Sequence, residues 1–456
     1  MTKDEIKELK EKLSYKNKNG WIGKDGEYHK NVFYFAEKYK EFIGNCKTER
    51  EVVRFVEEEF KNRAKKDDFF IVNRGKSIAL IRIGDGFGAK IIASHIDAPR
   101  IDLKQNPLFE DTGFALFHTH YYGGIKKYQW FNIPLAIHGV IVKGDGEVLN
   151  IVVGEDDNDP IFVLPDLLPH LSHKIQDDKK VKEAFEAEKM KLIVGSIPID
   201  DEEKDTVKLN ILKILNEKYG IIEEDFISAE LTLVPAFKPR DVGFDEGLIA
   251  AYGHDDRICA YCSKEAFFDA NSNKTAVVLM IDKEEIGSDG NTGAKSRFLL
   301  DVVVEILKKK GIDPTFENVG EFLKNSEVLS ADVNGAVNPM YKEVHEKDNA
   351  SYINGGVVLT KFTGHGGKYM ANDASAEFVG KIRKIFNDAG VNWQIGELGK
   401  VDEGGGGTIA KYLAAWNMDV VDCGPALISM HSPYEIASKS DLYETYKAYK
   451  AFFESD

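Results

Sequence analysis

Five short segments of the sequence concentrate histidine and carboxylate side chains at the ends of apolar runs. They are SHIDAPR (94–100), GHDDR (253–257), DKEEIGSDG (282–290), SADVNGAVNP (330–339) and SMHSPYE (429–435). Each segment alone has an ordinary explanation, such as a core histidine, a solvated acidic pair or a helix cap. Together, two histidines with several carboxylates are the ligand set expected of zinc or a similar hydrolytic metal. The sequence therefore predicts a site for metal-assisted hydrolysis.

The spacing within two segments indicates which residues can bind metal, orient a ligand or act as the base. A hydrolase with two metal ions needs cations about 3.5–4 Å apart, a bridging carboxylate and a base for the attacking water. His95 and Asp97 lie on the same side of a strand, so Asp97 can accept a hydrogen bond from the far ring nitrogen of His95. Of the adjacent Glu284 and Glu285, one can bind metal while the other stays free as a base.

The elements that must position these residues alternate between strands and helices. Residues 1–65 are expected to be helical, mainly over Lys3–Leu13 and Asn31–Asn62. Apolar runs predict strands at 69–73, 77–84, 89–97, 275–282, 354–360 and 418–424. Such buried strands, whose ends carry polar residues, are typical of an α/β sheet with a site at the strand ends.

The middle of the chain has a different pattern. Between about 102 and 235, strand-like runs alternate with Gly, Asp and Pro turns, and a charged helical segment is expected over roughly 174–220. The strand-like runs of this part are 134–144, 147–154 and 227–237. We expect a catalytic α/β domain, residues 1–101 and 236–456, interrupted by an inserted β-rich domain, residues 102–235.

Composition excludes several classes of protein. The chain has 456 residues and a net charge of −16, which disfavours a nucleic-acid partner. Its apolar runs fall short of the roughly 20 residues that cross a bilayer, and the charged N-terminus lacks the apolar centre of a secretory signal. Four cysteines, including the Cys259-x-x-Cys262 pair, indicate reduced thiols with a structural role. We expect a cytoplasmic protein.

The polar segments, taken in order, resemble a known family. HIDAPRIDLK, HDDR, DKEEIGSDG, SADVNGAVNP with the following EVHE, and SMHSPYE are similar to the zinc aminopeptidases that include aspartyl aminopeptidase and vacuolar aminopeptidase I. The resemblance extends from about residue 90 to the C-terminus. It implies a zinc-exopeptidase-like mixed sheet flanked by helices, and removal of the N-terminal residue from peptide substrates. Two zinc ions would be bound per subunit, with manganese or cobalt as substitutes.

The resemblance also implies the zinc ligands. His95, Asp255 and Asp332 would hold one zinc, and Asp255, Glu285 and His431 would hold the other. Asp255 is then the bridging carboxylate.

The same resemblance assigns two further roles. Glu284 would be the general base, and Asp97 would stand behind His95. Asp256 is the rival of Asp255 as the bridge, because two adjacent aspartates leave the register ambiguous. Asp255 is preferred because related zinc peptidases place the ligand first in such a pair.

The inserted domain resembles that of the family through YYGGIKKYQWF (121–131) and LPDLLPHL (164–171). In the family this domain pairs subunits, and a histidine that matches His170 reaches the neighbouring active site to steady the reacting carbonyl. A homo-oligomer, a tetrahedral dodecamer built from dimers, is therefore expected.

Departures from the family pattern leave the preferred N-terminal residue open. TKFTGHGGKYMAND (360–373) is only loosely similar to the family, and DEGGGGT (402–408) replaces a more varied loop. Lys361, His365 and Lys368 can attract a carboxylate, although exposed lysines usually only solvate a surface. The rival functions are another di-metal amidohydrolase, either a carboxypeptidase or a deacylase, and an inactive shell protein.

Overall fold

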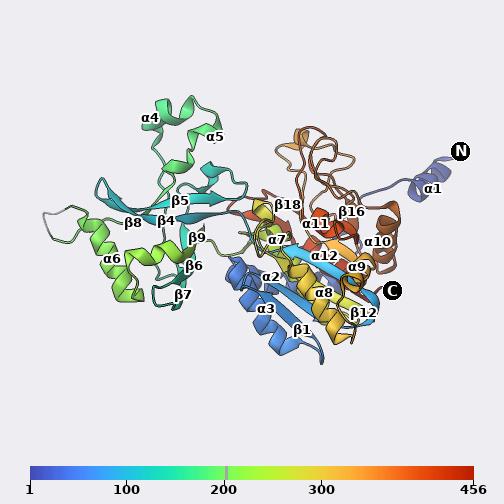
Figure 1. The fold of residues 1–456 in the computed structure, drawn as a ribbon. Coiled ribbons are helices and arrows are strands. Elements are labelled where there is room, and N and C mark those ends of the chain that lie inside the picture. Colours follow the sequence, from blue (N-terminus) through green and yellow to red (C-terminus); the bar gives the residue numbers. More distant parts are fainter. Residues whose placement is uncertain (201–203) are drawn as a thin grey trace.

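The apolar runs of the sequence assemble into an eight-stranded mixed sheet. The computed structural model describes residues 1–200 and 204–456 (Figure 1). In order across the sheet, the strands are β1 (Phe69–Asn73), β2 (Ser77–Arg82), β12 (Lys274–Ile281), β3 (Asp85–His95), β13 (Glu327–Ser330), β17 (Asp419–Gly424), β15 (Val357–Thr360) and β16 (Trp393–Ile395). The four central strands, from β12 to β17, run parallel, so their carboxyl ends meet at one edge.

Helices cover both faces of this sheet because its central strands are apolar on both sides. Ile92 of β3 packs in one core cluster, whereas its neighbours Ile91 and Ala93 pack in the other. The helices on the Ile92 face are α2 (Gly26–Asn45), α3 (Glu49–Arg63), α7 (His254–Asp269), α10 (Ala376–Asp388) and α12 (Lys439–Glu454). The helices on the opposite face are α8 (Phe298–Lys309), α9 (Phe316–Lys324) and α11 (Ala410–Ala414).

A smaller sheet lies beside this carboxyl edge of the large sheet, and further polar segments adjoin its strands. Its strands, in order, are β10 (Arg240–Val242), β11 (Leu248–Ala251), β19 (Glu435–Ser438), β18 (Ala426–Ile428) and β14 (Asn334–Gly335). Ala251 pairs with Glu435 across β11 and β19. This pairing brings the segment after β11 close to the turn between β18 and β19.

The third sheet forms a separate lobe with its own core (Figure 1). Its six antiparallel strands, in order, are β7 (Val148–Val153), β6 (Leu135–Val142), β9 (Ala229–Pro235), β4 (Arg100–Asp111), β5 (Phe114–Tyr122) and β8 (Lys191–Gly195). The helices of this lobe are α4 (Pro169–Ser172), α5 (Val181–Ala184) and α6 (Thr206–Tyr219), with shorter turns at Lys127–Trp130, His173–Asp177, Ala187–Lys189 and Glu223–Ser228. The division of the chain at 101/102 and 235/236 stays a prediction.

Two helix predictions differ from the structure. The stretch 31–62 contains parts of two helices, because Thr48 caps the second one and accepts the Glu51 N–H. The stretch 174–220 is wrong as a single helical segment, since β8 lies within it and pairs with β5. Residues 201–203 of that stretch lie outside the described residues.

The remaining helical elements are α1 and two short turns, and the four cysteines are free thiols. The expected helix over Lys3–Leu13 is α1, and short turns occur at Glu284–Ile286 and Lys342–Val344. All four cysteines are free and buried, Cys259 and Cys262 within α7. Within residues 1–200 and 204–456, none of the helices combines the length and the apolar character needed to cross a bilayer.

A buried charge cluster joins the six-stranded lobe to the rest of the chain. His138 of β6 lies between two carboxylates, with Nδ1 2.7 Å from Glu51 Oε1 and Nε2 2.9 Å from Glu155 Oε1. The Lys47 ammonium also donates to Glu155, at 2.6 Å. Burial opposes the charge of His138, but its hydrogen bonds to Glu155 and Glu51 raise its pKa above the ordinary value of 6.5.

This cluster predicts a pH-dependent contribution to stability. A raised folded pKa means that the stabilisation is complete below pH 6.5 and is lost as the pH rises through the folded value. We expect His138→Gln to lower the free energy of unfolding by about 3 kcal/mol near pH 6, and by less near pH 9. Chemical denaturation at the two pH values measures this difference. The exposed His173→Gln is the control, and an equal penalty for His138→Gln at both pH values would contradict the assignment.

Candidate metal centre

Three of the polar segments meet at the carboxyl edge of the parallel strands. His95 is the last residue of β3, and Asp332 follows β13 by two residues. Glu284 and Glu285 form a single turn just after β12. Because β12, β3 and β13 are adjacent and parallel, these four side chains reach the same space.

The other two histidine and aspartate segments arrive from the small sheet. Asp255 is the second residue of α7, four residues beyond the end of β11, and its peptide bond to Asp256 is cis. His431 lies in the turn between β18 and β19 with a positive φ of 65°. Two sheets therefore contribute to one centre.

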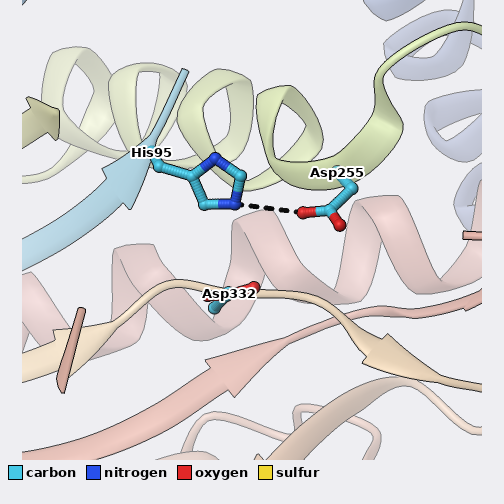
Figure 2. Close-up of side chains that lie close together, drawn as sticks. All are labelled: His95, Asp255 and Asp332. Carbon is cyan, nitrogen blue, oxygen red and sulfur yellow. Dashed lines mark hydrogen bonds and ion pairs between the residues drawn. The ribbon is translucent and has the colours of Figure 1, made fainter. Parts of the chain in front are cut away.

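Asp255 lies between the two histidines. Its Oδ1 is 3.1 Å from His95 Nε2, and its Oδ2 is 3.2 Å from His431 Nε2. Figure 2 shows His95 and Asp255 pointing toward each other, with Asp332 beside them. A carboxylate that offers one oxygen to each imidazole has the arrangement of a bridging ligand.

Two groups of possible ligands share Asp255. In the first, ligand atoms of His95, Asp255 and Asp332 lie within 4.8 Å of one another. In the second, the same limit holds for Asp255, Glu285 and His431. The structure thus brings together all five residues that the sequence singled out as ligands.

The electrostatics of the centre favour a bound cation. Burial, followed by the charge of Asp255, raises the pKa of Glu285, and burial also raises the pKa of Asp332. Burial opposes the charge of His431, but Asp255 and Glu285 raise its pKa to about 10. Within the described residues, the buried Glu285 Oε1 has no hydrogen-bond partner. These imidazole and carboxylate donors fit zinc, whose positive charge would offset the crowding.

Asp256 has a different role from its neighbour. Its Oδ2 accepts a hydrogen bond from the His95 backbone N–H at 3.2 Å. Asp256 belongs to neither ligand group, whereas Asp255 belongs to both. The geometry therefore favours Asp255 over Asp256 as the bridge, a choice that the sequence of two adjacent aspartates left ambiguous.

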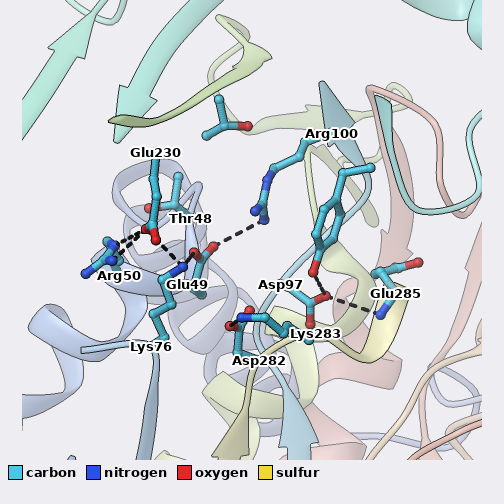
Figure 3. A network of polar contacts seen from close by, with 12 residues as sticks. Thr48, Glu49, Arg50, Lys76, Asp97, Arg100, Glu230, Asp282, Lys283 and Glu285 are labelled. Carbon is cyan, nitrogen blue, oxygen red and sulfur yellow. Dashed lines mark hydrogen bonds and ion pairs between the residues drawn. The ribbon is translucent and has the colours of Figure 1, made fainter. Parts of the chain in front are cut away.

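Asp97 fastens the turn that carries both glutamates. Its Oδ1 accepts from the Glu284 N–H at 3.1 Å. Its Oδ2 accepts from the Glu285 N–H at 3.2 Å (Figure 3). The expected contact with His95 is shared: His95 Nδ1 is 3.1 Å from the Asp97 carbonyl oxygen and 3.3 Å from Asp97 Oδ1. Asp97 thus orients the glutamate turn as well as the histidine.

Tyr122, a residue that sequence reasoning missed, supports Asp97 from the six-stranded lobe. The Tyr122 hydroxyl donates to Asp97 Oδ2 at 2.8 Å. The Arg100 guanidinium lies 4.0 Å from the centre of the Tyr122 ring and 3.2 Å from Glu49 (Figure 3). The segment YYGGIKKYQWF contains Tyr122, but periodicity alone does not reveal its partner.

Glu435 is a second residue that sequence reasoning left without a role. It closes the segment SMHSPYE and is 1% exposed. Its carboxylate accepts backbone hydrogen bonds from Asp255 and His431. The only sequence signal is a carboxylate that follows a candidate ligand and begins a strand.

The centre opens into a cavity of about 510 Å³. Glu284 lies at its wall, and burial raises the pKa of Glu284 to about 7. The glycine-rich segment 404–407 also lines this cavity. The candidate base and this segment therefore border the same space.

The predicted cationic residues are only partly at this cavity. Lys368 lines it, and its ammonium is 3.0 Å from Asp373. Lys361 is paired with the same carboxylate at 3.2 Å, and the lining contains neither Lys361 nor His365 among the described residues. Two lysines that the sequence analysis did not single out, Lys400 and Lys411, do line the cavity.

His170 is remote from the centre of its own chain. It lies exposed in α4, which projects from the six-stranded lobe away from the eight-stranded sheet (Figure 1). The nearby Leu168 and Leu171 are also exposed. A role at an active site would therefore require a second subunit.

Comparisons with known proteins show similarity over nearly the whole chain. The family model described as aminopeptidase I zinc metalloprotease (M18) matches residues 36–453. A probable M18 family aminopeptidase 1 of Thermotoga neapolitana is 51% identical, over 97% of this chain and 100% of that protein. The crystal structure of an M18 aminopeptidase from Thermotoga maritima is similar, with a TM-score of 0.92, 50% identity, and coverage of 97% and 100%. An S. cerevisiae mApe1 dodecamer shares the fold, with a TM-score of 0.73, 24% identity, and coverage of 94% and 97%.

Proposed function

This chain belongs to the M18 family of zinc metalloproteases and is a zinc aminopeptidase, and from that premise we propose how its residues act. The proposed enzyme uses two zinc ions and a glutamate base to release the N-terminal residue of a peptide. Family membership favours this activity over the carboxypeptidase, the deacylase and the inactive shell protein.

We propose that His95, Asp255 and Asp332 hold one zinc, and that Asp255, Glu285 and His431 hold the other. The observation that carries this proposal is the position of Asp255, which faces His95 with one oxygen and His431 with the other, at 3.1 and 3.2 Å. When bound, zinc supplies Lewis-acid polarisation of the scissile carbonyl.

Glu284 is the proposed general base. It takes a proton from the water that attacks the carbonyl carbon, and it returns that proton to the leaving amine. Two features support this role: its pKa near 7 lies close to neutral pH, and Asp97 anchors its backbone N–H at 3.1 Å. Asp97 is a positioning residue in this proposal, since it acts on Glu284 and His95.

The preference for the N-terminal residue stays a prediction. Lys368, Lys400 and Lys411 line the cavity and would attract an acidic substrate side chain. Glu397 and Asp422 line the same cavity and would oppose that attraction. An acidic N-terminal residue is therefore one candidate among those that a substrate panel must compare.

We propose that the inserted domain, residues 102–235, pairs subunits in a tetrahedral dodecamer built from dimers. The exposed leucines in and beside α4, Leu167, Leu168 and Leu171, support such pairing, since exposed apolar side chains are often covered at interfaces. His170 would then reach the active site of the neighbouring subunit and steady the reacting carbonyl. A cytoplasmic location remains a prediction.

The metal and substrate class can be tested together. Removal of metal by a chelator should abolish hydrolysis of aminoacyl reporters, and added zinc, manganese or cobalt should restore it. Peptides with a free N-terminus should be cleaved, whereas N-acetylated peptides should not. Rates on a panel of reporters would also give the preferred residue. Release of C-terminal residues, or cleavage of acetylated substrates, would contradict the aminopeptidase assignment.

The base can be tested separately from the metal. Glu284→Gln removes the proton acceptor but leaves every proposed zinc ligand in place. We expect kcat to fall by about 10²–10⁴-fold while zinc content stays at the wild-type value. Steady-state kinetics and elemental analysis give the two quantities. An active Glu284→Gln enzyme would remove Glu284 from this role.

The contribution of His170 can be separated from assembly. His170→Ala should lower kcat by about 10²–10³-fold, as expected for loss of a group that stabilises a developing charge. The mass of the assembly, measured by light scattering, should not change. His173→Ala, three residues away and exposed, is the control. A monomeric wild-type protein with full activity would contradict the proposal.

A further inference from the structure

Glu435 is a buried carboxylate whose hydrogen bonds both go to proposed zinc ligands. Its Oε1 accepts from the His431 backbone N–H at 2.7 Å, and its Oε2 accepts from the Asp255 backbone N–H at 3.0 Å. We propose that Glu435 is a positioning residue that sets the geometry of the zinc site formed by Asp255, Glu285 and His431. This inference rests on the two-zinc centre of the proposed function.

The strand pairing explains why Glu435 can reach both ligands. Glu435 begins β19 and lies opposite Ala251 at the end of β11. Asp255 follows Ala251 by four residues, and His431 precedes Glu435 by four residues. One carboxylate therefore ties together two turns that are 176 positions apart in sequence.

The backbone of His431 needs such an anchor. Its φ of 65° is in the left-handed region, which is unfavourable for a residue with a Cβ atom. The Glu435 carboxylate holds the N–H of this residue, and the Gly124 carbonyl oxygen lies 2.9 Å from its Nδ1. With both contacts made, His431 Nε2 faces Asp255 and Glu285. Loss of the Glu435 contact would release the backbone and move the imidazole.

The contact with Asp255 acts on the bridging ligand in the same way. Hydrogen bonds from backbone N–H groups to a carboxylate are charge-assisted and stronger than neutral ones. Asp97 makes an equivalent pair of contacts, to the N–H groups of Glu284 and Glu285. The two carboxylates together hold four backbone amides of the site. Sequence reasoning found Asp97 but not Glu435.

A matched control exists on α12. Glu444 is fully buried and accepts a hydrogen bond from the Asn392 backbone N–H at 2.8 Å. Its other partners are Tyr28, Lys24 and Lys447, which are outside the proposed centre. Glu444→Gln therefore makes the same chemical change at a buried carboxylate without touching a zinc ligand.

The test compares wild type, Glu435→Gln and Glu444→Gln in the full-length assembled protein. A glutamine keeps one acceptor oxygen but turns an N–H₂ group toward the second backbone N–H, so one ligand loses its anchor. We expect the Kd of the zinc proposed to bind Asp255, Glu285 and His431 to rise about 10–100-fold in Glu435→Gln, as outer ligand contacts typically contribute. Competition with a chromophoric chelator measures the Kd. The activity of this variant should recover as free zinc is raised, and Glu444→Gln should keep the wild-type zinc Kd.

Each alternative result has a defined meaning. Wild-type zinc affinity in Glu435→Gln, or an equal loss in Glu444→Gln, would overturn the inference, because the carboxylate would then contribute only to general stability. If Glu435→Gln does not fold, Glu435→Asp keeps two acceptor oxygens on a shorter arm, and an unchanged zinc Kd in it would overturn the inference as well. Fewer than two zinc ions in the wild type would overturn the two-zinc centre itself, so the two failures are distinguishable.

Discussion

Mutual repulsion among buried carboxylates is the constraint on which this structure depends. Asp255, Glu284, Glu285 and Asp332 line one cavity. Burial raises the pKa values of Glu284, Glu285 and Asp332 and so disfavours their charged forms. Burial acts in the same direction on Asp255, but its hydrogen bonds with His431 and His95 lower its pKa. Two imidazoles alone offset only part of that charge. A pair of divalent cations would offset the rest, so the same residues that destabilise the empty centre make it a strong metal site. The chemistry of the enzyme follows from this imbalance.

The fold holds these carboxylates together through hydrogen bonds to the backbone of the turns that carry them. The parallel strands β12, β3 and β13 position candidate ligands at the edge of one sheet, and the turns of the small sheet position Asp255 and His431. These residues lie in irregular turns, which need hydrogen-bond partners to hold one conformation. Asp97 and Glu435 provide those partners. A rigid ligand frame lowers the reorganisation needed when metal and substrate bind.

The six-stranded lobe also contributes to the centre of its own chain. Tyr122, the last residue of β5, donates to Asp97, and the Gly124 carbonyl oxygen lies beside His431 Nδ1. The cluster of His138, Glu51 and Glu155 fastens this lobe to α3. Movement of the lobe would therefore shift both the turn that carries Glu284 and Glu285 and the side chain of His431. An assembly that pairs subunits through this lobe would also hold the active site in register.

By itself, the sequence determined the donor types, their places at strand ends and the family, because apolar periodicity and ordered polar segments are local properties. It identified His95, Asp255, Glu285, Asp332 and His431 as one set. Only the tertiary structure distinguished Asp255 from Asp256, assigned partners to Tyr122 and Glu435, and paired Lys361 and Lys368 with Asp373. Those contacts depend on strand register and on turn conformations, and two of them join residues more than 150 positions apart. The periodicity of apolar residues does not predict such pairings, because each depends on how the sheets pack together.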